Sequence, residues 1–445
     1  MLTRSKTRLF GDRTIFAIIV LAYMAVLLPF RALPAKSGPY VPPVASRNPQ
    51  DTKGSSGPVF SRIKMFSRTD GWALSNQGVL KTADGGKTWN VMLSVDAGPT
   101  MSRELPPVNA AFVDRARAWV CRVAIEQSGP VEVSRTTDGG VHWATMAVPR
   151  SPKALYPDGS LQGCGLAILN DRTAWLMLVP EHGMGSEPRE LYRTSDGGAS
   201  WQFVSAAYTG SGGLPHGGQI EFGDAKTGWL LGSVNTTTPS IFSVTEDGGV
   251  TWRRDDLPLP KGLSGAKTEI QGLPDLPMPT GEVQLEVEDP PHFFPADLHR
   301  GVLASRFMTG PYESAKYFIV IYRTFDGGRT WQPGEPIGPV VFPISASDFA
   351  NIEKGWVWSV SQPAIPGKLY STGDGGKTWA VVAGNLPQLM AEREMQQLDF
   401  VDGEYGWALT TPHLVAGQRV QTTELFGTID GGKSWNRVGA VYTGR

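Results

Sequence analysis

The amino-acid sequence predicts an all-β protein, a single seven-bladed β-propeller of four-stranded antiparallel blades preceded by an N-terminal membrane or signal helix. Two recurring motifs and the composition predict this fold. The chain of 445 residues contains 53 Gly, 35 Pro and 14 Trp, with 19% charged residues. Such a composition is typical of short strands joined by tight turns. The length exceeds what one ordinary core supports, so we expect a repeat array.

One turn motif appears seven times, first as Thr82-Ala83-Asp84-Gly85-Gly86-Lys87-Thr88-Trp89. Its aspartates lie 48 to 58 residues apart, except for 79 residues between the fourth and fifth copies. Because a short acidic side chain can cap its own turn and glycine supplies positive φ, we interpret the aspartates as structural, with calcium binding as the alternative. These seven residues are Asp84, Asp138, Asp196, Asp247, Asp326, Asp374 and Asp430.

A second motif precedes each turn motif: an aromatic or aliphatic residue, a turn, and then a small residue with Trp, as in Phe222 to Gly228-Trp229. The fifth copy has Gly301-Val302 instead. Together the motifs give four strand-length segments per repeat, with the Asp-Gly-Gly turn between the third and fourth strands. Seven such repeats predict a ring of blades.

The N-terminus predicts export. Basic residues within the first 13 positions precede an uncharged, apolar run over residues 14–30. We expect residues 1–31 to be a signal anchor or a cleaved signal peptide, and 32–57 to be a Pro/Gly/Ser-rich tether. The positive-inside rule then places the propeller, residues 58–445, outside the inner or thylakoid membrane, or in the periplasm if the signal is cleaved.

These motifs resemble the BNR or Asp-box propellers, which include sialidases, xyloglucanase-type glycosidases and sortilin-like receptors. The arrangement is most similar to the photosystem II stability and assembly factor, a noncatalytic family that holds membrane-protein intermediates. The resemblance implies a noncatalytic protein that binds a membrane-associated protein partner. A glycan-binding or glycoside-hydrolysing, sialidase-like propeller is the alternative. Against it, Lys64 stands where the sialidase Arg-Ile-Pro signature would have proline.

The loops opposite the Asp-Gly-Gly turns vary most, and specificity usually lies on such loops. The Pro-rich insertion 258–291 accounts for the long spacing, and its apolar residues suit a partner; it could also cover a blade edge, because residues 282–287 alternate like a strand. Residues predicted to contact the partner are Ile270, Leu273, Leu276, Met278 and the loop histidines His182, His216 and His292.

The sequence shows no catalytic, cofactor or metal motif, and we expect none of these sites. The formal net charge of −1 and the lack of a basic block argue against a nucleic-acid partner. Cys121 and Cys164 fit either a disulfide or two buried thiols. Ring closure also stays open, because the last repeat carries its own fourth strand while residues 40–58 could add an edge strand.

Overall fold

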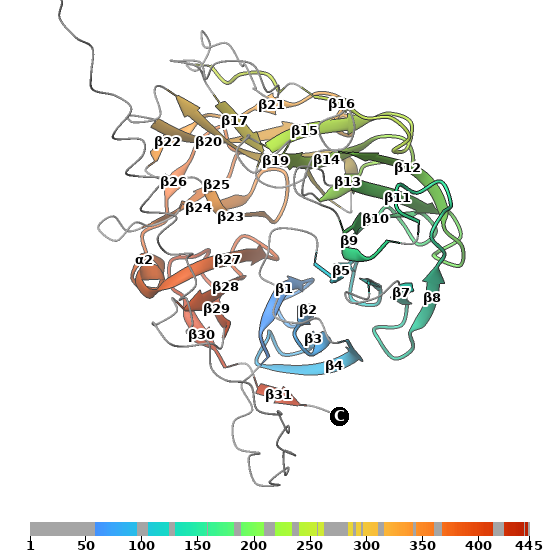
Figure 1. The fold of residues 1–445 in the computed structure, drawn as a ribbon. Helices are drawn as coiled ribbons and strands as arrows, with labels where there is room; N and C mark the ends of the chain where they lie inside the picture. The colour runs from blue at the N-terminus through green and yellow to red at the C-terminus, as the bar shows by residue number, and fades with distance from the viewer. Residues whose placement is uncertain are drawn as a thin grey trace, which may run out of the picture. The chain divides into compact units, whose positions relative to one another are not determined.

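Seven antiparallel sheets follow one another along the chain in a computed structural model (Figure 1). The chain divides into residues 1–55 and 56–445. The described residues all belong to the second unit. They are 58–95, 106–123, 130–157, 159–181, 188–208, 219–233, 240–255, 257–261, 284–287, 291–294, 297–309, 316–340, 344–359, 367–412, 422–439 and 441–443.

The first four blades each contain four strands in sequence order. Blade 1 has β1 (Phe60–Met65), β2 (Gly71–Ser75), β3 (Gly78–Thr82) and β4 (Thr88–Ser94). Blade 2 has β5 (Val108–Phe112), β6 (Ala118–Arg122), β7 (Val131–Thr136) and β8 (Ala144–Val148). Blade 3 has β9 (Leu161–Ile168), β10 (Ala174–Pro180), β11 (Pro188–Thr194) and β12 (Gln202–Tyr208). Blade 4 has β13 (Ile220–Phe222), β14 (Gly228–Ser233), β15 (Ser240–Thr245) and β16 (Arg253–Arg254).

The remaining blades complete the repeat. Blade 5 has β17 (Gln284–Val287), β18 (His292–Phe294), β19 (Asp297–Thr309), β20 (Lys316–Thr324), β21 (Gln332–Pro333) and β22 (Ile337–Val340). Blade 6 has β23 (Ile344–Phe349), β24 (Gly355–Ser359), β25 (Lys368–Thr372) and β26 (Ala380–Val381). Short helices α2 (Leu386–Leu389) and η2 (Met390–Glu392) lead into blade 7, with β27 (Arg393–Phe400), β28 (Gly406–Pro412), β29 (Glu424–Thr428) and β30 (Asn436–Val438).

The seven sheets close into a ring. Successive blades meet through β2 and β5, β5 and β9, β9 and β13, β15 and β17, β19 and β23, and β23 and β27. The last blade returns to the first through β27 and β1. The predicted all-β, seven-bladed propeller is therefore confirmed. No helix in the described ranges is long and apolar enough to cross a membrane, and the predicted membrane segment 14–30 lies outside those ranges.

A fifth strand joins blade 1 from the far end of the chain. Strand β31 (Val441–Thr443) pairs in parallel with β4, with Tyr442 opposite Trp89. Blade 7 keeps its own fourth strand, β30, as the sequence predicted. The closing strand thus comes from residues 441–443, which no motif in the sequence indicated. Hydrogen bonding along the outer edge of blade 1 gives the closure a backbone component beside side-chain packing.

Blade 5 departs from the repeat because it has six strands. Its β19 and β20, of 13 and 9 residues, are the longest strands in the described part of the chain. Strand β17 pairs with the second half of β19, and β22 pairs with the first half of β20. Most of insertion 258–291 lies outside the described residues, but β17 confirms that residues 284–287 of its alternating segment form a strand.

Cys121 in β6 and Cys164 in β9 form a disulfide, with Cα atoms 6.3 Å apart. Both residues are fully buried. The sequence fits either a disulfide or two buried thiols, and the structure shows the disulfide. The bond joins blade 2 to blade 3.

Candidate functional site

The sequence-predicted partner residues are mostly outside the described ranges. These residues are Ile270, Leu273, Leu276, Met278, His182 and His216. His292 is described, and its predicted position in a loop is wrong, because it begins strand β18. It occupies the innermost strand of blade 5, where it pairs with Val302. Alternation of the short segment His292–Phe294 was too brief to indicate a strand.

The seven Asp-Gly-Gly turns share one hydrogen-bond pattern. In blade 1, Oδ1 of Asp84 accepts from the backbone N–H of Thr88 (2.9 Å), and Oδ2 accepts from the Thr88 hydroxyl (2.6 Å). The Thr82 hydroxyl donates to Asp84 and accepts from the Gly86 N–H. Equivalent bonds from the residue four positions later are made to Asp138, Asp196, Asp247, Asp326, Asp374 and Asp430. These carboxylates are therefore engaged within their own turns.

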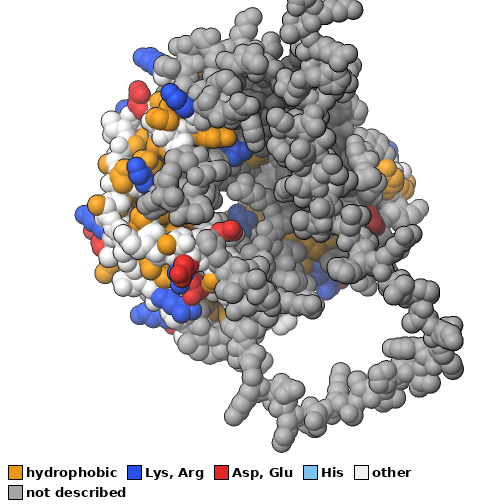
Figure 2. Space-filling model, turned by 60° about the vertical axis from the view of Figure 1, so that its left-hand side comes forward, with side chains coloured by type: hydrophobic (Ala, Val, Ile, Leu, Met, Phe, Trp, Pro, Cys, Tyr) orange, Lys and Arg blue, Asp and Glu red, His pale blue; other side chains and the backbone are white. Residues whose placement is uncertain are grey.

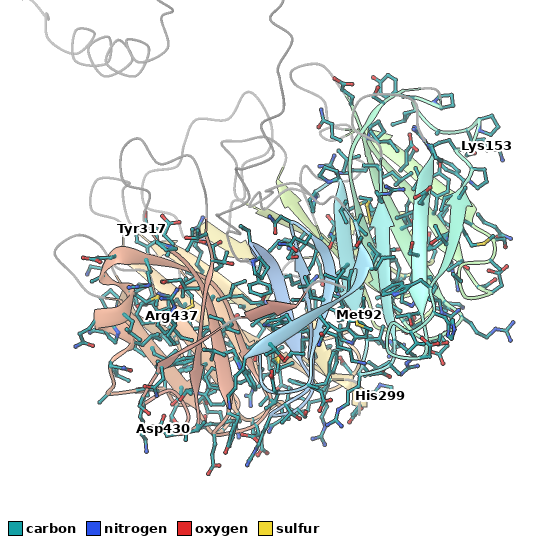
Figure 3. The ribbon with its side chains drawn as sticks, turned by 90° about the horizontal axis from the view of Figure 1, so that it is seen from below. Met92, Lys153, His299, Tyr317, Asp430 and Arg437 are labelled. Atoms are coloured by element: carbon teal, nitrogen blue, oxygen red, sulfur yellow. A yellow bond between two sulfur atoms is a disulfide. The ribbon has the colours of Figure 1, made fainter. Side chains whose placement is uncertain are left out.

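The two faces of the ring are distinct. In Figure 3, Asp430 of the blade 7 turn and His299 lie along one edge of the unit, while Tyr317 and Lys153 lie along the opposite edge. The Asp-Gly-Gly turns mark the first face, which we call the turn face. The second we call the loop face. Figure 2 shows an opening in the middle of the ring with acidic and basic side chains beside it.

Strand register aligns one residue of each innermost strand around this opening. We call it the ring position: the residue paired with the second-strand Trp, or with Val302 in blade 5. The seven ring positions are Lys64, Ala111, Ala167, Glu221, His292, Asp348 and Asp399. We call the opening that these positions surround the channel. Five of the seven residues are ionisable, so the ring positions form the candidate functional site.

Asp399 connects blade 7 to blade 1. Its Oδ1 lies 2.6 Å from Lys64 Nζ, and its Oδ2 accepts a 2.5 Å hydrogen bond from the backbone N–H of Met65. The carboxylate is 1% exposed and the Lys64 side chain 31% exposed. Gln397 adds two bonds to the same strand, accepting from the Ile63 N–H and donating to its carbonyl. Free backbone groups on the inner edge of β1 thereby gain partners.

Asp348 repeats this contact one blade earlier. Its Oδ2 accepts a 2.5 Å hydrogen bond from the N–H of Phe400, which pairs with Gly406 as Met65 pairs with Gly71. In both blades the carboxylate at the ring position therefore binds the equivalent backbone N–H of the following blade. These two aspartates hold neighbouring blades together.

Burial and neighbouring charges shift the pKa values of the side chains at the ring positions. Burial raises the pKa of both Asp348 and Asp399, and repulsion between the two carboxylates adds to this effect for Asp399, while Lys64 opposes it. Burial disfavours the charged form of Lys64, yet attraction to Asp399 and Asp348 outweighs it and raises the pKa of Lys64. One ammonium group is thus shared between two carboxylates.

Glu221 and His292 occupy neighbouring blades, and within the described residues neither forms an ion pair like that of Lys64 with Asp399. Burial raises the pKa of Glu221 to about 8, with Arg62 opposing the shift. His292 is open to solvent but lies deep among the inner strands; this enclosure and the charge of Lys64 lower its pKa to about 4. At neutral pH, Glu221 is mostly protonated and His292 is neutral. Both can donate or accept hydrogen bonds to a group entering the channel.

Sequence reasoning missed this site, although a signal was present. Each acidic ring residue directly precedes the aromatic residue of the second motif, as in Glu221-Phe222, Asp348-Phe349 and Asp399-Phe400. Only the strand register shows that Lys64 and His292 are equivalent to them. Within the described ranges, no three His, Cys, Asp or Glu side chains are grouped to hold a metal ion.

No protein family and no curated protein matches the chain by sequence. Among solved structures, YCF48 bound to D1 peptide is 16% identical, with 87% of this chain and 99% of that chain covered and a TM-score of 0.45. YCF48 is a photosystem II assembly factor, so the similar structures include the family that the sequence motifs resemble.

Enzymes are among the similar structures as well. The GH74 xyloglucanase from Xanthomonas campestris is 16% identical, with 83% of this chain covered and a TM-score of 0.47; the match spans about half, 54%, of the xyloglucanase. The polysaccharide lyase Uly1 is 10% identical, with 85% and 90% of the two chains covered and a TM-score of 0.46. At such identities the likeness concerns the fold and not the activity.

Proposed function

We propose that this protein is a noncatalytic, extracytoplasmic propeller that binds a protein partner, as an assembly or stability factor for a membrane complex. The observation that carries the proposal is the enlarged blade 5. Two strands beyond the four-stranded repeat, β17 and β22, flank the loop-face ends of β19 and β20. Neither strand belongs to the four-stranded repeat, although β17 also contacts β15 where blades 4 and 5 meet.

Pairing places this extension at the loop face. Gln284 of β17 pairs with Met308, and Val340 of β22 pairs with Tyr317. Met308 and Tyr317 precede and follow the loop between β19 and β20. The loop-face ends of β17, β19, β20 and β22 together offer a broad surface to a partner. Such a surface suits protein binding better than enclosure of a small ligand.

The noncatalytic assignment rests on the use of the channel carboxylates. Asp348 and Asp399 each bind a backbone N–H of the next blade, and Asp399 also binds Lys64. The carboxylates of the Asp-Gly-Gly turns are likewise engaged locally. A pair of carboxyl groups acting as acid and base needs access to a substrate and freedom to exchange protons. Glycosidase activity that Glu221→Gln abolishes without unfolding the protein would contradict this assignment and favour the sialidase-like alternative.

The test of partner binding replaces residues 262–283 by a Gly/Ser segment of equal length, leaving β17 in place. The variant should keep its thermal stability, and the amount of partner recovered by affinity purification from native membranes should fall at least tenfold. The same exchange in residues 360–366, which connect β24 to β25 in the sequence, is the control and should leave recovery within about twofold. Unchanged recovery by the 262–283 variant would overturn the role of the insertion in partner binding.

We also propose that residues 14–30 keep the protein at the outer side of the membrane. The basic residues before this apolar run support that orientation. Protease added to intact spheroplasts should digest the propeller, and the membrane fraction should retain the full chain beforehand. Complete protection from protease would contradict the topology, whereas recovery in the soluble periplasmic fraction would indicate a cleaved signal.

A further inference from the structure

The third strand of the first three blades carries a basic residue opposite the second-strand tryptophan. These pairs are Lys81 with Trp72, Arg135 with Trp119 and Arg193 with Trp175, and Arg323 pairs with Val302 in blade 5. The cationic groups lie over the indole rings, 4.7 Å from the centroid for Lys81, 5.1 Å for Arg135 and 5.0 Å for Arg193. Such contacts are attractive, because the face of an indole ring is negative.

The same basic residues reach the Asp-Gly-Gly turn of the next blade. Lys81 donates to the carbonyl of Gly139 (3.2 Å) and Arg135 donates to that of Gly197 (2.8 Å). Where the indole makes the bond instead, Trp175 donates to Gly248, Trp356 to Gly431 and Trp407 to Gly85. A donor from one blade therefore binds the first glycine carbonyl of the following turn.

The interface between blades 4 and 5 lacks this arrangement. Val244 stands opposite Trp229, where blades 1 to 3 have Lys or Arg and blades 6 and 7 have Ser371 and Gly427. Trp229 is fully buried, and its Nε1–H has no hydrogen-bond partner among the described residues. No described donor binds the carbonyl of Gly327, the equivalent acceptor in blade 5. Among the six second-strand tryptophans, all of which are described, only Trp229 has neither a bonded indole N–H nor a cation over its ring within the described part of the chain.

A pocket of about 360 Å³ opens at this interface on the turn face. Val244, Thr227 and Gly328 form its more buried part, and Trp229 lies directly against Gly328. The charged lining residues are Asp224, Glu246, Asp255, Lys226, Arg253 and Arg329. The pocket is too large for a single water molecule, whose share of liquid volume is about 30 Å³.

The charges around the pocket favour a cation over an anion. Arg253 already pairs with Glu246 (3.0 Å) and Asp255 (3.4 Å). Arg329 donates to the carbonyl of Asp326 in its own turn and lies 3.8 Å from Asp224. Asp255 is the least exposed of the charged side chains in these ion pairs, at 23%, whereas Arg253 and Arg329 are 59% and 63% exposed. The buried lining of the pocket is therefore apolar, and the most enclosed charged group beside it is the carboxylate of Asp255.

We infer that this pocket binds an arginine side chain of a protein partner. The guanidinium group donates to the Gly327 carbonyl, as Arg135 donates to the equivalent Gly197 carbonyl in the blade that follows its own. The methylene stem contacts Val244, and Asp224 and Asp255 balance the charge. Arginine suits the site better than lysine because its planar, weakly hydrated fork donates several hydrogen bonds. This site is separate from the loop-face surface proposed above.

The test uses isothermal titration calorimetry of the full-length protein with acetyl-Gly-Arg-Gly-amide. The matched probe acetyl-Gly-citrulline-Gly-amide keeps the shape and removes the charge. A single charged side chain in such a pocket should bind with a Kd of about 1 mM, and the citrulline probe should bind at least about tenfold more weakly. Val244→Arg should abolish binding of the arginine probe and raise the Tm, because the new side chain fills the pocket from within.

Val244→Leu is the control, since it adds an apolar group without a cation. It should leave the arginine probe preferred over the citrulline probe, and its Tm should stay below that of Val244→Arg. Equal binding of the two probes by the unmodified protein, or no binding of either at 20-fold the expected Kd, would overturn the inference. Unchanged binding by a folded Val244→Arg variant would overturn it as well. If that variant does not fold, the comparison of the two probes still decides.

Discussion

Asp399 should contribute much more to stability than an ordinary surface ion pair between the same two blades. Its carboxylate makes two charge-assisted hydrogen bonds, to Lys64 Nζ at 2.6 Å and to the Met65 N–H at 2.5 Å. Bonds of this kind contribute about 1.5–3 kcal/mol each. Burial of the carboxylate, which raises its pKa, offsets part of this gain. Asp399→Ala should therefore lower the free energy of unfolding by about 3 kcal/mol.

A graded series checks the reasoning. Asp399→Asn keeps an oxygen for the Met65 N–H and loses the charge, so it should cost about 1.5 kcal/mol. The control is Asp402→Asn, which disrupts the exposed pair of Arg68 with Asp402 (3.0 Å) and keeps the oxygen that caps its own turn. This change should cost at most about 0.5 kcal/mol. Urea denaturation of the full-length protein, followed by tryptophan fluorescence, measures all three. A cost for Asp399→Ala no greater than that of the control would refute the reasoning.

Three further predictions follow from the described contacts. Replacing Cys121 and Cys164 together by alanine should lower the free energy of unfolding by about 4 kcal/mol, because their bond closes a 43-residue separation; urea denaturation with and without reductant measures this, and reductant should not affect the variant. Glu221→Gln should stabilise the protein at pH 9 and have little effect at pH 4. Because burial raises the pKa of Glu221, its ionisation destabilises the fold as the pH rises from 4.5 through about 8. Melting temperatures measured from pH 4 to pH 9 check this, and a constant difference between the two proteins would contradict it. Asp196→Ala should lower the Tm by about 1–2 °C, since the Ser200 hydroxyl and N–H lose their acceptor. Hydrogen bonds from Ser200 lower the pKa of Asp196 to about 2, so this contribution is present above pH 3.8 and is lost as the pH falls through 2; an unchanged Tm at pH 7 would count against the cap.

The sequence by itself determined the repeated parts of this protein. Each Asp-Gly-Gly turn is formed by residues within a few positions of one another, as when Asp84 binds Thr88 and the following glycines adopt φ of +78° and +90°. Such local chemistry can be recognised from residue types and spacing alone. Because it recurs seven times at blade-length intervals, the number of blades and the fold class follow from the sequence.

Only the tertiary structure decided what lies between blades. The contact of Lys64 with Asp399 joins residues 335 positions apart, and the bond between Cys121 and Cys164 depends on how two sheets are placed. Strand β31 finds β4 only after the ring closes. Val244 looks like any buried strand residue until the register aligns it with Arg135 and Arg193. Local residue patterns specify turns and strands, but contacts between blades depend on register and ring closure, and no short stretch of sequence contains that information.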